Sequence, residues 1–287
     1  MFRNNIKTVV LLSVLGALFL GIGSFFGQGG LIIGLVLGIV FVGGSYWFSD
    51  KIAVRAAGAV PVSEAEAPQL YAIVRDLTQR ADMPMPKMYV SPASQPNAFA
   101  TGRNPDHAAV AVTQGLMQVV DEDELRGVLA HELSHVKNRD ILISSVAATV
   151  ALGITFSARM LMWGAMFGGF GGGNDREGNG GNIFGLLAMM ILAPIAATLL
   201  QLALSRSREY EADRSGAELV GDGEPLARAL LKIEAVAKQV PMNVDPAHAT
   251  AYIINPLTGR QVSFKNLFQT HPPTEERVAR LRHQHVH

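Results

Sequence analysis

The segment His-Glu-Leu-Ser-His at residues 131–135 combines residue types that can bind a metal and move a proton. His131 and His135 are four positions apart, so a helix places both imidazoles on one face, where they can bind one Zn²⁺. Glu132, between them in sequence, is suited to take a proton from a water that the zinc activates. We therefore predict a zinc-dependent peptidase with one Zn²⁺ per chain. The competing interpretation is a solvated helix with incidental histidines.

A catalytic zinc takes three protein ligands, and the chain contains no cysteine, so the third ligand must be His, Asp or Glu. His135 lies a few residues before an apolar run at 141–158, and Glu209 lies about as many residues after a second apolar run at 183–204. A hairpin of two packed helices would bring these residues to the same height and side. Glu211 has nearly the same height, so the residues alone leave both glutamates as candidates. Asp213, one turn after Glu209, can accept a hydrogen bond from a ligand imidazole.

The composition points to a membrane rather than to nucleic acid. The 287 residues are 49% hydrophobic, and 24 Lys plus Arg balance 24 Asp plus Glu, so no strongly basic surface is available for a phosphate backbone. Apolar runs at 6–26, 31–48, 141–158 and 183–204 are each long enough to cross a bilayer core of about 30 Å. The alternative for the last two runs is a buried hairpin of a soluble core.

The distribution of Lys and Arg around these runs predicts the topology. Basic residues flank the outer ends of the runs, whereas the turn at 27–30 and the glycine-rich segment at 168–182 lie between paired runs. The positive-inside rule then places both termini and the active site in the cytoplasm and the segment 168–182 outside. Four parts follow: a transmembrane hairpin at 1–49, a first catalytic part at 50–140, a second hairpin at 141–204 and a second catalytic part at 205–287.

Local patterns predict the elements that position the site. Ser63 and Glu66 form a capping-box pattern ahead of an amphipathic helix, and Asp121 with Glu124 can cap the helix that carries the histidines. Short strands are expected at 87–91, 97–101 and 108–113, with a turn at 102–106. The strand residues Asn97, Ala98, Phe99 and Ala100 could form a sheet edge to which an extended substrate adds, or a merely structural strand.

The remaining histidines are weaker candidates. His271 lies in a rigid Thr-His-Pro-Pro turn before a helix expected at 275–281, and it is a candidate donor to the oxyanion of the reaction. Its alternative roles are a helix cap or a buried structural residue. His283, His285 and His287 form either a loose metal-binding tail or a disordered end, and His107 and His248 are expected at the surface.

Four stretches resemble the HtpX-type family of membrane zinc metalloproteases, in the wider group that includes the CAAX prenyl proteases. They are residues 97–102, 131–135, 205–213 and 271–273, and the resemblance covers essentially the whole chain. It implies that Glu209, the first glutamate of Glu-Tyr-Glu-Ala-Asp, is the third zinc ligand and that Asp213 orients a ligand. It also implies a multi-pass protein of the bacterial inner membrane that degrades misfolded or damaged membrane proteins.

The fold expected from these observations is a mainly α integral membrane protein with four transmembrane helices and a cytoplasmic zincin-like α+β metalloprotease domain. Its partners would be protein substrates and the lipid bilayer, with no nucleic acid. A peptidase that processes one defined peptide or lipidated tail is an alternative, as is a catalytically silent membrane scaffold. The presence of Glu132 argues against the scaffold, and the substrates and oligomeric state do not follow from the sequence.

Overall fold

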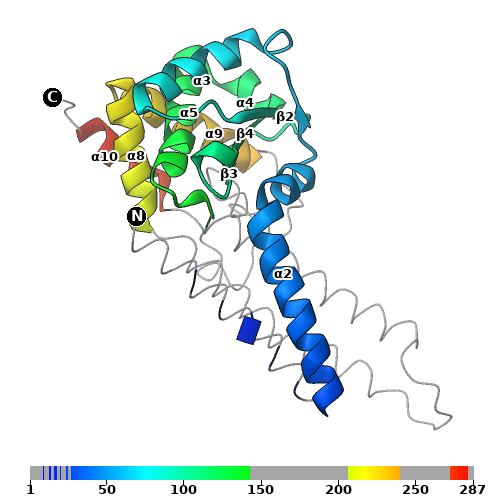
Figure 1. Cartoon of the computed structure of the whole chain (residues 1–287). Helices are drawn as coiled ribbons and strands as arrows, with labels where there is room; N and C mark the ends of the chain where they lie inside the picture. Colours follow the sequence, from blue (N-terminus) through cyan, green and yellow to red (C-terminus); the bar gives the residue numbers. More distant parts are fainter. Residues whose placement is uncertain are drawn as a thin grey trace, which may run out of the picture.

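The computed structural model describes residues 27–142, 206–239 and 272–283, together with the single positions 9, 13, 16, 17, 20 and 24. In these residues a small mixed sheet is surrounded by helices (Figure 1). In chain order the elements are α2 (Gly27–Ala56), β1 (Val60–Pro61), α3 (Pro68–Ala81), β2 (Lys87–Ser91), β3 (Ala98–Gly102), η1 (Pro105–His107), β4 (Ala108–Thr113), α4 (Gln114–Val119), α5 (Glu122–Lys137), α8 (Arg206–Val220), α9 (Glu224–Gln239) and α10 (Thr274–His283).

The sheet has the strand order β1-β2-β4-β3. β2 pairs with β4 in parallel, whereas β1 with β2 and β3 with β4 pair antiparallel. The strands predicted at 87–91 and 108–113 are confirmed, and the third begins at Ala98, one residue later than predicted. All six residues of β4 are buried, as expected for a central strand. β3 forms the opposite edge from β1, in agreement with the expectation of an edge strand.

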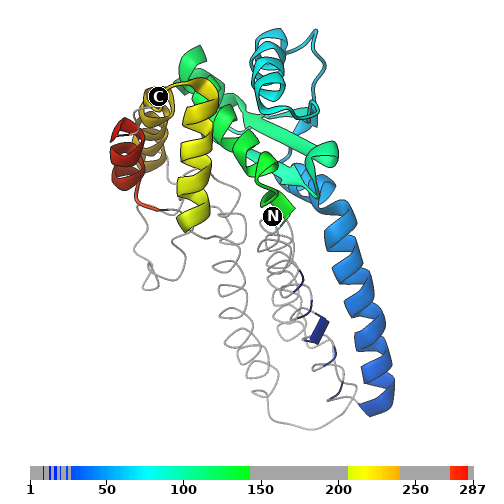
Figure 2. The same cartoon turned by 60° about the vertical axis from the view of Figure 1, so that its left-hand side comes forward.

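α5 is the central helix of the body, and it packs most extensively against α8 and α9 (Figure 2). The predicted cap is present, because the Asp121 side chain accepts a hydrogen bond from Glu124 N at 2.9 Å and Glu124 Oε2 accepts one from Asp121 N at 3.0 Å. The apolar face of α5 joins the main core, where Val128 and Leu129 are fully buried. The helix that carries the metal-binding pattern is therefore held at its start and along its length.

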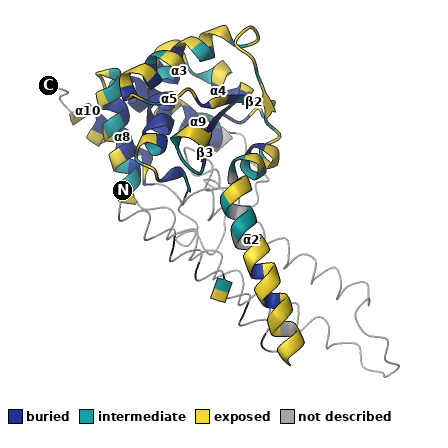
Figure 3. Ribbon diagram, in the orientation of Figure 1, coloured by how far each residue is buried: buried dark blue, intermediate teal, exposed yellow. Residues whose placement is uncertain are grey.

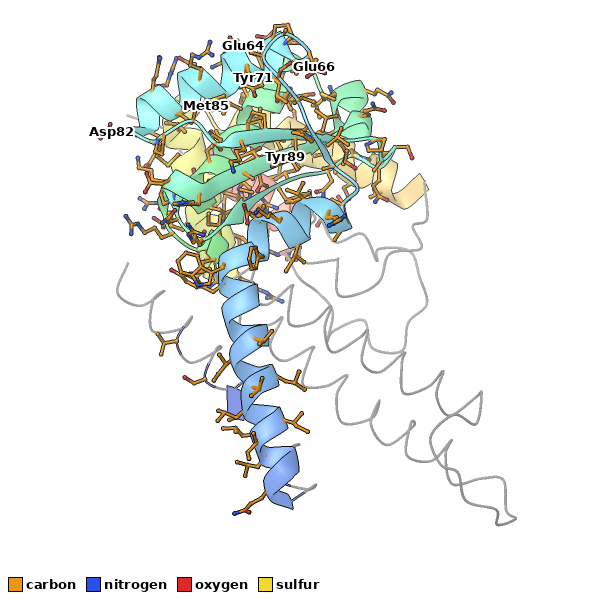
Figure 4. All side chains as sticks on the ribbon, turned by 45° about the vertical axis from the view of Figure 1, so that its right-hand side comes forward. Glu64, Glu66, Tyr71, Asp82, Met85 and Tyr89 are labelled. Atoms are coloured by element: carbon orange, nitrogen blue, oxygen red, sulfur yellow. The ribbon has the colours of Figure 1, made fainter. Side chains whose placement is uncertain are left out.

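The capping box predicted at Ser63 is wrong. Glu66 Oε2 does accept hydrogen bonds from Ser63 N at 2.7 Å and from Ser63 Oγ at 2.6 Å, but they close a separate turn. α3 begins only at Pro68, and its N-cap, Ala67, makes no side-chain hydrogen bond. Proline is favoured in the first helical turn and disfavours helical geometry in the residue before it, so the helix starts there. Glu66 lies at the end of the body far from the projecting part of α2 (Figure 4).

α2 projects from the body and exposes most of its length (Figure 3). Its exposed side chains include Ile32, Ile33, Ile39 and Val40, each more than 60% accessible. Among the described residues, no helix is long and apolar enough to cross a membrane. The run predicted at 31–48 falls within α2, whereas most of the runs at 6–26 and 141–158, the run at 183–204 and the segment 168–182 lie outside the described residues.

Candidate metal centre

The close approach of α8 to α5 depends on Gly216. A Cβ atom at this position would lie 3.0 Å from the backbone nitrogen of His131 and 3.1 Å from its Cα, tighter than ordinary carbon contacts. Gly216, Asp213 and Glu209 share one face of α8 at intervals of three and four residues. The glycine therefore allows the two acidic side chains to reach the histidines of α5.

His131, His135 and Glu209 form a group whose ligand atoms all lie within 4.8 Å of one another. His131 Nε2 and His135 Nε2 are 3.2 Å apart, and the Glu209 carboxylate lies 3.8 Å from the first and 3.7 Å from the second. Ligands about 2.0–2.1 Å from a tetrahedral zinc are about 3.3 Å from each other, so the donors present fit this ion.

The position of Glu211 distinguishes the two candidate third ligands. Glu209 is buried, with a relative exposure of 5%, whereas Glu211 is exposed and accepts a hydrogen bond from Arg214 Nη2 at 2.6 Å. Residues two apart on a helix point in nearly opposite directions, so only one of the pair can face α5. The structure places Glu209 there.

A buried chain of contacts stands behind His131. Asp213 Oδ1 lies 2.9 Å from His131 Nδ1, and Asp213 accepts two hydrogen bonds from Arg277 of α10, at 2.9 Å from Nε and 2.7 Å from Nη2. Arg277 is only 1% exposed. Burial would raise the pKa of Asp213, but Arg277 outweighs it and lowers the pKa to about 2. Asp213 is therefore ionised, and it can accept a hydrogen bond from the N–H of His131 Nδ1.

His135 has its own carboxylate partner. Its Nδ1 lies 3.1 Å from Asp140 Oδ1, and Asp140 is 3% exposed. Burial would lower the pKa of His135, but Asp140, with Glu209 and Glu132, raises it to about 10. Asp140 reaches this position through a turn after α5 in which Arg139 has a left-handed backbone with φ of 55°.

Glu132 faces the edge strand. Its Oε2 accepts a hydrogen bond from Ala100 N of β3 at 2.9 Å, and its exposure is 6%. Burial raises the pKa of the Glu132 carboxyl, against the opposing effect of His131 and His135. The predicted substrate strand and the predicted base are thus in direct contact.

The structure brings most of the predicted site residues together. His131, Glu132 and His135 of α5, Glu209 and Asp213 of α8, and Ala100 of β3 lie at one place, whereas His271 lies outside the described residues. His107 is exposed, as predicted, and His283 ends α10 at the surface, with His248, His285 and His287 outside the described residues.

Sequence reasoning missed Asp140 and Arg277. The sequence does contain a pattern that could have indicated the role of Arg277. Arg277 shares a helix face with Thr274, Val278 and Leu281, all buried, and a charged residue on such a face needs a partner. No such pattern indicates Asp140, since its approach depends on the turn at Arg139.

A model of peptidase family M48 matches residues 64–285 of the chain. The chain belongs to peptidase family M48. Relatives named protease HtpX homolog include one from Syntrophobacter fumaroxidans, 54% identical over 281 residues, which cover 97% of this chain and 99% of that protein. Another, from Desulfatibacillum aliphaticivorans, is 50% identical over 97% of this chain and 89% of the relative. The resemblance to the HtpX-type family is confirmed.

The fold has a counterpart among solved structures. The crystal structure of S. mikatae Ste24p is similar with a TM-score of 0.51 and 23% identity, covering 98% of this chain and 66% of the other. The mainly helical M48 fold with a small mixed sheet is therefore shared between the two. Family membership and the group of His131, His135 and Glu209 make this chain an M48 zinc metallopeptidase.

Proposed function

We propose that this M48 protein is a zinc endopeptidase in which Glu132 acts as general base and His131, His135 and Glu209 hold the metal. The observation that carries the proposal is the contact of Glu132 with Ala100 N at 2.9 Å beside the metal-binding group. It puts a carboxylate of raised pKa between the metal-binding group and β3, the edge strand of the sheet in the described residues. A raised pKa makes this carboxylate a stronger proton acceptor.

Zinc at this site would supply Lewis-acid activation of a water and of the peptide carbonyl. Glu132 would take the proton from the attacking water and deliver it to the leaving amine. Asp213 and Asp140 each hold the Nδ1 side of one imidazole, which leaves the Nε2 lone pairs of His131 and His135 for the metal. His271 is proposed, from its sequence position alone, as a donor to the oxyanion.

The substrate would bind as an extended strand along β3. The N–H of Ala100 points to Glu132 and therefore away from β4, so the edge of β3 that no other described strand pairs with faces the metal-binding group. Ala98, on the same edge as Ala100, would position the peptide by backbone hydrogen bonds, whereas the backbones of Asn97 and Phe99 face β4 and these residues would support the strand. This edge does not depend on the identity of substrate side chains, which suits a peptidase with broad specificity.

We further propose that the four apolar runs anchor the enzyme in the bacterial inner membrane, with both termini and the site in the cytoplasm. The four-part division of the chain, with catalytic parts at 50–140 and 205–287, belongs to the same proposal. The exposed isoleucines of α2 and the Lys and Arg distribution support it. In this setting the substrates would be misfolded or damaged membrane proteins.

The test compares the purified full-length protein with Glu132→Gln, measuring zinc content and cleavage of casein. We expect the variant to keep its zinc, because both imidazoles and Glu209 remain, and to lose proteolysis. Glu122→Gln is the matched control, since Glu122 is exposed on the same helix. Substantial turnover by Glu132→Gln would refute the mechanism, and a wild type that binds zinc without cleaving would favour a scaffold.

Topology has a separate test. The chain contains no cysteine, so single cysteines can be introduced within 168–182 and labelled from either side of the membrane. Labelling from the outside supports the proposed orientation. Labelling from the cytoplasm alone would overturn it.

A further inference from the structure

Two arginines lie close to the acidic groups of the metal centre, and they differ in what they bind. Arg277 is fully buried and directs two nitrogens at Asp213, so its donors are used within the protein. Arg208 lies in the first turn of α8, immediately before Glu209. Both of its terminal nitrogens, Nη1 and Nη2, are buried and have no hydrogen-bond partner in the part of the chain that the structure describes.

The burial of Arg208 is the reverse of the usual arrangement. Arginine side chains normally bury their aliphatic part and leave the guanidinium in water. Arg208 as a residue is only half-buried, yet its charged end is the part removed from solvent. A buried donor without an acceptor costs about 1–3 kcal/mol and more when charged. An arrangement with this cost is expected where a ligand supplies the acceptor.

Arg208 directly precedes the metal-binding Glu209 in α8, and its guanidinium is within electrostatic reach of the metal centre. Burial lowers its pKa, while Asp140 and Glu209 raise it by charge attraction, which places both carboxylates nearby. Neither is free to pair with it, because Asp140 contacts His135 Nδ1 and Glu209 belongs to the metal-binding group. The described residues therefore supply no acceptor for the Arg208 guanidinium, and a ligand bound at the metal centre can supply one.

We propose that Arg208 is a substrate-binding residue whose guanidinium donates hydrogen bonds to a backbone carbonyl oxygen of the peptide bound at the metal. This inference rests on the proposed endopeptidase function. A peptide offers carbonyl oxygens at every residue, and a charged donor in a buried site binds them strongly without selecting a side chain. Its contact would hold the chain on the side of the metal where Asp140 supports His135.

The experiment uses zinc-loaded full-length protein and a quenched fluorescent peptide whose C-terminus is amidated. Arg208→Met removes the donors and keeps much of the volume, Arg208→Lys keeps the charge, and Arg206→Met removes an exposed cation from the same helix turn. We expect Arg208→Met to lower kcat/KM by about 10–100-fold, Arg208→Lys to recover part of the loss, and Arg206→Met to change little. Zinc content should stay at the wild-type level in all three.

A binding measurement keeps the test independent of turnover. In the Glu132→Gln background, the affinity for the uncleaved peptide is measured by fluorescence anisotropy with and without Arg208→Met, and we expect weaker binding without Arg208. If the wild type fails to cleave, the proposed function fails while this measurement still decides the role of Arg208. Unchanged kcat/KM and peptide affinity in Arg208→Met would overturn the inference, as would a loss explained wholly by lost zinc. A loss confined to peptides with a free C-terminal carboxylate would overturn it too.

Discussion

Asp140 lies behind His135, with its two carboxylate oxygens 3.1 and 3.2 Å from the imidazole Nδ1. This contact fixes the ring and leaves Nε2 for the metal. Replacing Asp140 with Asn keeps the shape but removes the charge that favours a proton on Nδ1. We expect the zinc affinity, after correction for proton competition at His135, to fall by about 10–100-fold, measured by competition with a chelator at several pH values.

Asp106→Asn is the matched control for this change, because Asp106 is exposed in η1 and is not a member of the metal-binding group. Its zinc affinity should equal that of the wild type. Equal affinities for both variants would show that Asp140 does not support His135.

Arg277→Met should destabilise the protein strongly, because it leaves Asp213 charged and buried beside His131. Breaking a buried ion pair by removing one partner typically costs about 3–5 kcal/mol of unfolding free energy. Denaturant unfolding measures it. Arg282 lies on the same helix as Arg277 and forms an exposed ion pair with Glu224 of α9. Arg282→Met should therefore have little effect on stability. A larger effect from Arg282 than from Arg277 would contradict the role given to the buried pair.

The same pair predicts a dependence on acid. The folded-state pKa of Asp213, about 2, lies below its unfolded value of about 3.9. The contribution of Asp213 to folding stability is therefore fully present above about pH 3.9. It is lost as the pH falls through about 2. Unfolding of the wild type in this range should therefore show a pH dependence that Asp213→Asn reduces.

Glu209→Ala should remove more zinc than any loss of a supporting residue, since it deletes an anionic ligand. Glu211→Ala is the control two residues away, and its exposed side chain should leave the metal in place. Asp213→Ala should fall between them. Metal analysis of the purified variants decides the order. An empty Glu211 variant beside a loaded Glu209 variant would mean that α8 faces α5 with a different side.

Zinc binding should release a proton from His135. In the metal-free protein its pKa of about 10 keeps the ring charged at pH 8, whereas a metal ligand must be neutral. Apparent zinc affinity should therefore rise by about tenfold per pH unit from about 7 to 9. The charged ring of His135 stabilises the metal-free fold. This stabilisation is fully present below about pH 6.5 and is lost as the pH rises through about 10.

Calorimetry in buffers of different ionisation enthalpy counts the released protons. Asp140→Asn removes a main cause of the raised pKa, so it should release less than the wild type at pH 8. The same proton release from both proteins would contradict this account of His135.

Patterns that act within one element were predictable from the sequence. The capping box of α5 and the strands β2 and β4 depend on neighbouring residues, and the structure has them as expected. The start of α3 was misplaced because two local signals competed, and Pro68 fixed the backbone where Ser63 did not.

Contacts between distant segments were predicted less completely. Spacing placed His131 and His135 on one face, but it left Glu209 and Glu211 equivalent until the resemblance separated them. The pairing of Arg277 with Asp213 joins positions 64 residues apart, and nothing local encodes their distance. Asp140 depends on one left-handed residue, Arg139, which is uncommon for a side chain of its size.

The metal centre draws on β3, α5, α8 and α10, so its parts are synthesised at very different times. A growing chain contains both histidines of α5 long before Glu209, and Arg277 of α10 is made later still. Because a metal site forms only when its ligands are held together, hydrolytic capacity arrives at the end of folding. An incomplete or locally unfolded copy would therefore not cleave the chains around it. This protects the proteins among which the peptidase is synthesised, without a separate inhibitor.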